Sequence, residues 1–149
     1  MRALLLSGAA LLLVAAGTKE DQAQSELKRF AGNWVLDAGE MDGKKLSDEQ
    51  IHKSKIRGKG NRVILRTPHQ SKKAIKARIT LDPTKTPREM DFVRSAGPHK
   101  GQKLSAIYEF LGEDRYRICF DPHGKTRPKE FSTKEGTGHI LHVWRRAKK

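Results

Sequence analysis

The stretch Lys73-Ala74-Ile75-Lys76-Ala77-Arg78-Ile79-Thr80-Leu81 decides the fold that the sequence predicts. From Ile75 to Leu81 its apolar and polar side chains alternate with a period of two, which is the pattern of a strand with one face against a core. An antiparallel sheet allows this division, because its second face can meet water. The stretch therefore predicts a half-buried antiparallel strand that carries Lys76 and Arg78 on its outer face.

Similar short stretches recur on both sides of this strand and are separated by turn signals such as Asp42-Gly43 and the two prolines at 83 and 87. A short helix is expected at 25–32 and a helical turn at 46–51. Eight to ten short strands with hardly any helix predict an all-β antiparallel sandwich or a closed up-and-down barrel. The expected strands cover residues 34–41, 53–58, 62–67, 73–81, 88–94, 103–111, 115–121, 129–133 and 139–146.

Length and composition narrow the class of protein. The chain has 149 residues and 36% hydrophobic content, with 31 Lys and Arg against 17 Asp and Glu, so its formal charge is +14. That length predicts one domain. One cysteine excludes an intramolecular disulfide and a zinc site with two or more thiolates. We expect Cys119 to be a buried, inert thiol within a strand.

The first residues read as a targeting segment. Arg2 is followed by an apolar run from Ala3 to Ala16, which as a helix would extend about 21 Å, short of the ~30 Å hydrocarbon core of a membrane. Small residues end the run, so residues 1–17 are predicted to be a cleaved secretory signal, with an uncleaved anchor as the alternative. We expect an exported protein, periplasmic or extracellular, with a flexible lead-in at 18–24 and one domain at 25–149.

The start of the first strand resembles a known fold family. Gly32-Asn33-Trp34 follows the short predicted helix and resembles the G-x-W start of lipocalin-type barrels. In those proteins the Trp plugs the base of the barrel beneath a basic side chain from the last strand. The resemblance implies structural roles for Gly32 and Trp34, with Arg145 or its neighbour Arg146 as the cation over the ring.

A second resemblance covers nearly the whole chain after the signal. The sequence is similar to an uncharacterised family of small exported domains abundant in planctomycete bacteria. Ala106 departs from the Gly expected before Ile-Tyr-Glu. The resemblance implies a lipocalin-like barrel of about eight strands and implies no activity, ligand or cofactor. It rests on Gly32-Asn33-Trp34, Leu81-Asp82-Pro83-Thr84-Lys85-Thr86-Pro87 with Met90-Asp91, Gly97-Pro98-His99-Lys100-Gly101, Ile107-Tyr108-Glu109, Ile118-Cys119-Phe120, and Arg127-Pro128 with Glu130-Phe131-Ser132.

Residues with catalytic or metal-binding chemistry form no recognisable motif. His139 and His142 are three apart, which in a strand places them on opposite faces, and His99 and His123 lie in turns. No metal site, cofactor or enzyme activity is therefore predicted. A glycoside hydrolase remains an alternative, because it would need only two converging carboxylates. The acidic residues available for that role are Asp91, Glu109, Asp114, Asp121 and Glu130.

Two functions of different kinds follow from the predicted barrel. The first is binding of a small apolar ligand inside it, although an ordinary filled core has the same pattern. The second is binding of an anionic surface or polyanion, because residues 51–81 contain ten basic residues and no acidic one. The simpler alternative is that this face binds no partner and only keeps the protein soluble. Export argues against nucleic acid as the partner. The ligand-binding candidates are Ile75, Ala77, Ile79, Tyr108, Phe110, Ile118 and Phe120. The polyanion-binding candidates are Lys53, Lys55, Arg57, Arg62, Arg66, Lys73, Lys76 and Arg78.

Overall fold

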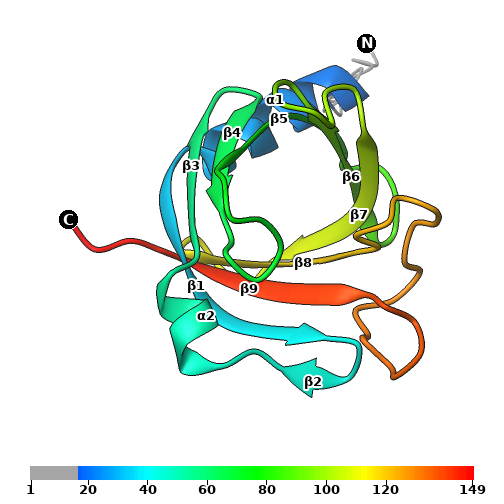
Figure 1. Cartoon of the computed structure of the whole chain (residues 1–149). Coiled ribbons are helices and arrows are strands. Elements are labelled where there is room, and N and C mark those ends of the chain that lie inside the picture. Colours follow the sequence, from blue (N-terminus) through cyan, green and yellow to red (C-terminus); the bar gives the residue numbers. More distant parts are fainter. Residues whose placement is uncertain (1–16) are drawn as a thin grey trace, which may run out of the picture.

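The strands between residues 32 and 146 follow one another around a closed antiparallel barrel (Figure 1). The computed structural model describes residues 17–149. Each barrel strand pairs with the next, and the last returns to pair with the first, which confirms the predicted up-and-down, lipocalin-like barrel. A two-residue strand, β2 (Lys44–Lys45), adds to the edge of the first. The eight barrel strands are β1 (Gly32–Met41), β3 (Lys55–Lys59), β4 (Arg62–Arg66), β5 (Ile75–Asp82), β6 (Arg88–Arg94), β7 (Lys103–Phe110), β8 (Arg115–Phe120) and β9 (Ile140–Arg146).

The two ends of the barrel differ. At one end, called the closed end here, β1 begins, β9 finishes and helix α1 (Lys19–Phe30) packs against the strands. At the other, called the open end, the chain forms the turn after β1 and the connections 67–74, 95–102 and 121–139. Figure 1 looks into the barrel, with α1 behind β4 and β5.

Helix α1 begins earlier than predicted. Residues 18–24, expected to be a flexible lead-in, form its cap and first turns, and it extends to Phe30. Thr18 and Asp21 bond reciprocally across the first turn, so the N-cap is Thr18, ahead of the predicted start at residue 25. The predicted signal at 1–17 lies almost wholly outside the described residues. None of the helices in the described part of the chain is long and apolar enough to cross a membrane.

The alternation that predicted the strands is confirmed where it was clearest. In β5, Ala77, Ile79 and Leu81 are buried while Lys76 and Arg78 are exposed. Helix α2 (Asp48–His52), capped by Ser47, takes the place of the predicted helical turn. The strand predicted at 129–133 is wrong, since that segment is irregular within the long connection 121–139.

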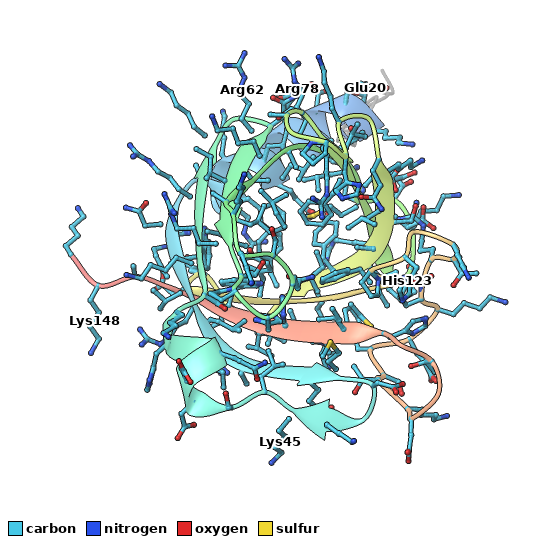
Figure 2. The ribbon with its side chains drawn as sticks, viewed as in Figure 1. Glu20, Lys45, Arg62, Arg78, His123 and Lys148 are labelled. Atoms are coloured by element: carbon cyan, nitrogen blue, oxygen red, sulfur yellow. The ribbon has the colours of Figure 1, made fainter. Side chains whose placement is uncertain are left out.

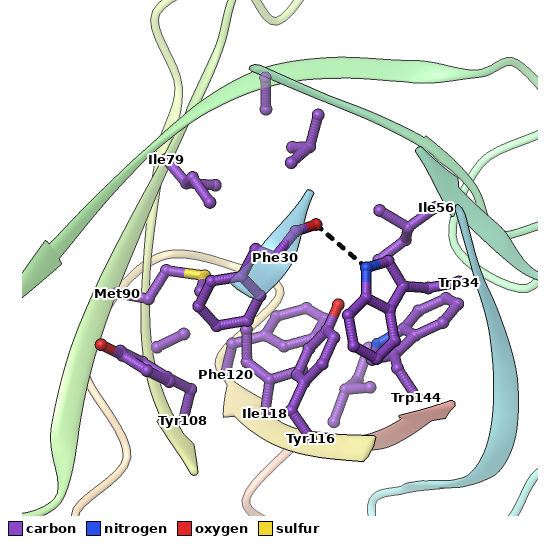
Figure 3. Packing of buried hydrophobic residues seen from close by; sticks show 14 of the residues in the cluster. Phe30, Trp34, Ile56, Ile79, Met90, Tyr108, Tyr116, Ile118, Phe120 and Trp144 are labelled. Carbon is purple, nitrogen blue, oxygen red and sulfur yellow. Dashed lines mark hydrogen bonds between the residues drawn. The ribbon is translucent and has the colours of Figure 1, made fainter. Parts of the chain in front are cut away.

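Aromatic side chains fill the closed end, as Figure 3 shows. Phe30 ends α1 inside the barrel and contacts the rings of Tyr108, Phe110 and Tyr116. The Trp34 indole Nε1 donates a hydrogen bond of 3.0 Å to the Phe30 carbonyl. The last residue of α1 is thereby held in the barrel as a plug.

A basic side chain of β9 covers Trp34, as the lipocalin resemblance implied, and it belongs to Arg146. Its guanidinium lies 4.2 Å from the Trp34 ring and donates hydrogen bonds to the carbonyls of Ala31 (2.9 Å) and Arg29 (3.1 Å). Of the two candidates, Arg145 is wrong for this role, because the neighbouring position on a strand points outward, where Arg145 pairs with Asp37. Gly32 has φ 103° and would, with a Cβ, approach an Arg146 nitrogen to 3.2 Å.

Candidate functional site: the barrel cavity and the outer basic face

The barrel encloses a cavity of about 430 Å³ between the aromatic plug and the open end. Strands β3 to β5 supply aliphatic walls from alternate positions such as Ile56, Val63 and Ile79, while the residues between them face solvent. Phe30 and Trp144 contribute aromatic surface to the same lining. The volume lies within the range of small-molecule sites, whose linings are mostly apolar with few polar groups.

Five of the seven predicted ligand-binding residues line this cavity: Ile75, Ala77, Ile79, Ile118 and Phe120. The other two, Tyr108 and Phe110, lie at the closed end and are separated from the cavity by the plug. Tyr108 is buried, contacts Phe30, and donates a hydrogen bond to the Glu26 carboxylate of α1. Phe110 packs beneath the guanidinium of Arg29. Both side chains therefore attach α1 to the barrel.

Polar residues join the lining at the open end. His142 of β9 is inward between Ile140 and Trp144, and its Nε2 lies 3.0 Å from the Nε2 of His69 in the 67–74 connection. Burial lowers the pKa of His142 to about 3 and also lowers the pKa of His69. Two neutral rings can share one N–H···N bond, which fastens this connection to the barrel interior.

Sequence reasoning missed the cavity roles of His69, Phe30 and Arg94. Arg94 has a detectable signal, because it continues the inward alternation of Met90 and Phe92 along β6, and all three line the cavity. His69 lies in an irregular connection, where no periodicity assigns a side chain to a face. Phe30 precedes the first strand and enters the barrel only because α1 turns into β1.

The basic residues of the central segment form a continuous exposed face on β3, β4 and β5. Cross-strand register places Lys55 opposite Arg66 and Arg62 opposite Arg78. Figure 2 shows the labelled pair Arg62 and Arg78 side by side and pointing away from the barrel. Among residues 17–149 no acidic side chain forms an ion pair with these cations. We call this surface the outer basic face; its candidates are Lys55, Arg57, Arg62, Arg66, Lys76 and Arg78.

The two remaining polyanion candidates lie outside those strands. Lys73 is exposed in the 67–74 connection, close in sequence to the open-end start of β5. Lys53 follows α2 and pairs with Glu49 one helical turn earlier. Six of the predicted cations thus lie on one sheet surface. Lys73 lies at its margin, and Lys53 pairs with Glu49 instead.

The acidic residues weighed for hydrolysis are engaged away from the cavity, since none of them is in its lining. Asp91 pairs with Arg127 at 2.7 Å and with Lys103 at 2.9 Å. Asp121 accepts backbone N–H groups of the connection that follows it. The other three pair with basic side chains: Glu109 with Arg117, Asp114 with Arg146, and Glu130 with Lys134.

The remaining reactive residue types are dispersed. His99 is exposed in the 95–102 connection and His139 precedes β9, while His123 reaches the open-end lining. Within residues 17–149, no three His, Cys, Asp or Glu side chains cluster as metal ligands would. Cys119 is buried on β8, and burial raises the pKa of its thiol.

The chain matches no protein-family model, and no curated protein or solved structure is significantly similar to it. The resemblance to the planctomycete family therefore stays a prediction from the sequence blocks.

Proposed function

We propose that this chain is an exported, non-enzymatic binding domain that takes a small apolar ligand into its barrel. The observation that carries the proposal is the cavity of about 430 Å³, with aliphatic walls from β3 to β5, Met90 and Phe92 from β6, and aromatic surface from Phe30 and Trp144. Transfer of an apolar ligand from water into such a space is favourable in proportion to the area buried. Export is supported by the signal-like composition of residues 1–17.

The cavity is tested by titrating 1-decanol and other lipophilic probes while following tryptophan fluorescence, because Trp144 lines the cavity. We expect a saturable change for the natural sequence. Ala77→Phe, which places a ring into the cavity, should weaken binding by at least about tenfold. Thr80→Phe adds the same ring to an exposed position of the same strand and should bind normally. Flat curves across a chemically broad panel, or equal binding by both variants, would contradict the proposal.

A second candidate function is binding of an anionic polymer or surface through the outer basic face. Its support is the direct opposition of Arg62 to Arg78 and of Lys55 to Arg66, since like charges in register repel each other unless anions compensate them. A polyanion that neutralises these cations releases counterions, so its affinity falls steeply with salt.

Retention on a heparin column measures this second function. We expect the triple reversal Lys73→Glu, Lys76→Glu and Arg78→Glu to abolish most of the retention. A matched reversal of Lys100, Lys125 and Lys129, exposed lysines outside the outer basic face, should retain most of it. Equal losses in the two triple variants would show that net charge governs retention and that the face has no special role.

A further inference from the structure

The cavity lining contains a guanidinium where the apolar wall of β6 meets the open end. Met90, Phe92 and Arg94 follow one another on the inward side of that strand, so the wall changes from apolar to cationic along its length. Cross-strand register places Arg94 opposite the small side chain of Ala77, which is buried and also lines the cavity. The Arg94 side chain therefore extends from a wall that is otherwise built for an apolar ligand.

The buried part of this guanidinium has no partner. The Nε of Arg94 is buried and donates to no acceptor, and no carboxylate of the described chain lies within ion-pair distance of the side chain. Arg127 shows the usual arrangement in this barrel, since it bonds Asp91 and two backbone carbonyls. A buried donor without an acceptor destabilises the protein, and more so when it is charged.

A second buried nitrogen in the same lining also lacks a hydrogen-bond partner. The Nδ1 of His69 is buried and has no hydrogen-bond partner, while the Nε2 of the ring faces Nε2 of His142. If His142 Nε2 donates across that contact, the proton of the neutral His69 ring is on Nδ1. The open end of the cavity then offers two N–H donors, one of them cationic, next to an apolar interior.

We propose that the barrel's ligand is a single-chain amphipathic carboxylate, with its apolar chain among the walls of β3 to β6 and its carboxylate bonded by Arg94. The inference rests on the proposed cavity function and specifies its ligand class. A carboxylate supplies the acceptors that the guanidinium lacks, and charge-assisted bonds of this kind are the strong ones. The volume of about 430 Å³ suits one hydrocarbon chain, because it lies near the lower end of small-molecule sites.

Calorimetric titration with decanoate and with 1-decanol at neutral pH tests this inference, because the two probes share a chain and differ in the headgroup. We expect the natural sequence to bind decanoate more tightly than the alcohol. Arg94→Met should weaken decanoate binding by about ten- to a hundredfold and leave the alcohol unchanged. Arg145→Met removes an equal charge from an exposed, outward position of β9 and should leave both affinities unchanged.

The outcomes separate this inference from the cavity function. Two results would refute a carboxylate ligand bonded by Arg94 while leaving the cavity function standing. One is binding of the alcohol with no preference for decanoate, and the other is decanoate binding that Arg94→Met does not weaken. Equal weakening of decanoate binding by Arg94→Met and Arg145→Met overturns this inference too, because the effect is then one of overall charge. Binding of neither probe by the natural sequence removes the cavity function and this inference together. Retained alcohol binding by Arg94→Met shows that the variant is folded.

Discussion

Replacement of Arg146 by Met is expected to destabilise the barrel far more than the same replacement at Arg145. The two residues are adjacent on β9 and carry the same charge. Arg146 turns toward the closed end, where it covers Trp34 and bonds the carbonyls of Arg29 and Ala31. Arg145 turns outward to an exposed ion pair with Asp37. Arg146 is half-buried and also pairs with exposed Asp114. The pair of variants therefore compares a half-buried cation at the closed end with an exposed one at constant composition.

The expected difference follows from the contacts that each variant loses. A hydrogen bond with a charged group contributes about 1.5–3 kcal/mol, and the cation over the indole about 0.5–2 kcal/mol. Water reaches part of the Arg146 side chain and will solvate some of the freed carbonyls, so we expect a loss of about 2–4 kcal/mol. An exposed ion pair such as that of Arg145 contributes about 0–1 kcal/mol.

Equilibrium unfolding in urea, followed by tryptophan fluorescence, measures both losses. A loss of this size lowers the midpoint for Arg146→Met by about 1–2 M, with the slope unchanged. Arg145→Met should shift the midpoint by less than about half that amount. Equal shifts for the two variants would refute the reasoning, because the cation over Trp34 would then contribute no more to the free energy of unfolding than an exposed ion pair does.

Two further predictions concern buried titratable groups. Burial lowers the pKa of His142 to about 3, so the unfolded chain binds the proton first and stability should fall by up to about 1.4 kcal/mol per pH unit below about pH 6.5. His142→Gln should flatten that dependence relative to the exposed control His52→Gln, and identical slopes in urea unfolding would contradict it. Cys119 is buried and burial raises its pKa, so a thiol reagent should label it slowly in the native protein and rapidly in urea. Fast labelling without denaturant would show that the β8 thiol is accessible.

The sequence predicted antiparallel strands because the alternation in β5 is regular enough to assign a face to each side chain. The choice of a barrel over a sandwich came from the resemblance to lipocalin-type proteins. Ala77 and Ile79 face inward, and Lys76 and Arg78 outward, as that pattern required. The same rule places Ile64 on the outer side of β4, beside Arg62 and Arg66, and Ile64 is exposed. Period-two patterning thus predicted the antiparallel strands and most of the cavity wall.

Periodicity assigns a face but no depth along the barrel, which is why the cavity was predicted only in part. Tyr108 and Phe110 are in phase with the core, yet Phe30 occupies the space in front of them. The cap of α1 was placed too late, because residues 18–24 are polar and only their bonding through Thr18 and Asp21 starts the helix. The contact between His69 and His142 joins positions 73 residues apart, and no local pattern records it.

Methyl NMR with selectively labelled isoleucine tests most directly whether the barrel binds its ligand internally. Ile75, Ile79 and Ile118 line the cavity, whereas Ile64 is exposed on the outer face of β4. On titration with 1-decanol, an internal site predicts saturable shifts of the three lining residues and none for Ile64. Lining resonances that stay unchanged at saturating probe, or shifts confined to Ile64, would contradict a binding cavity.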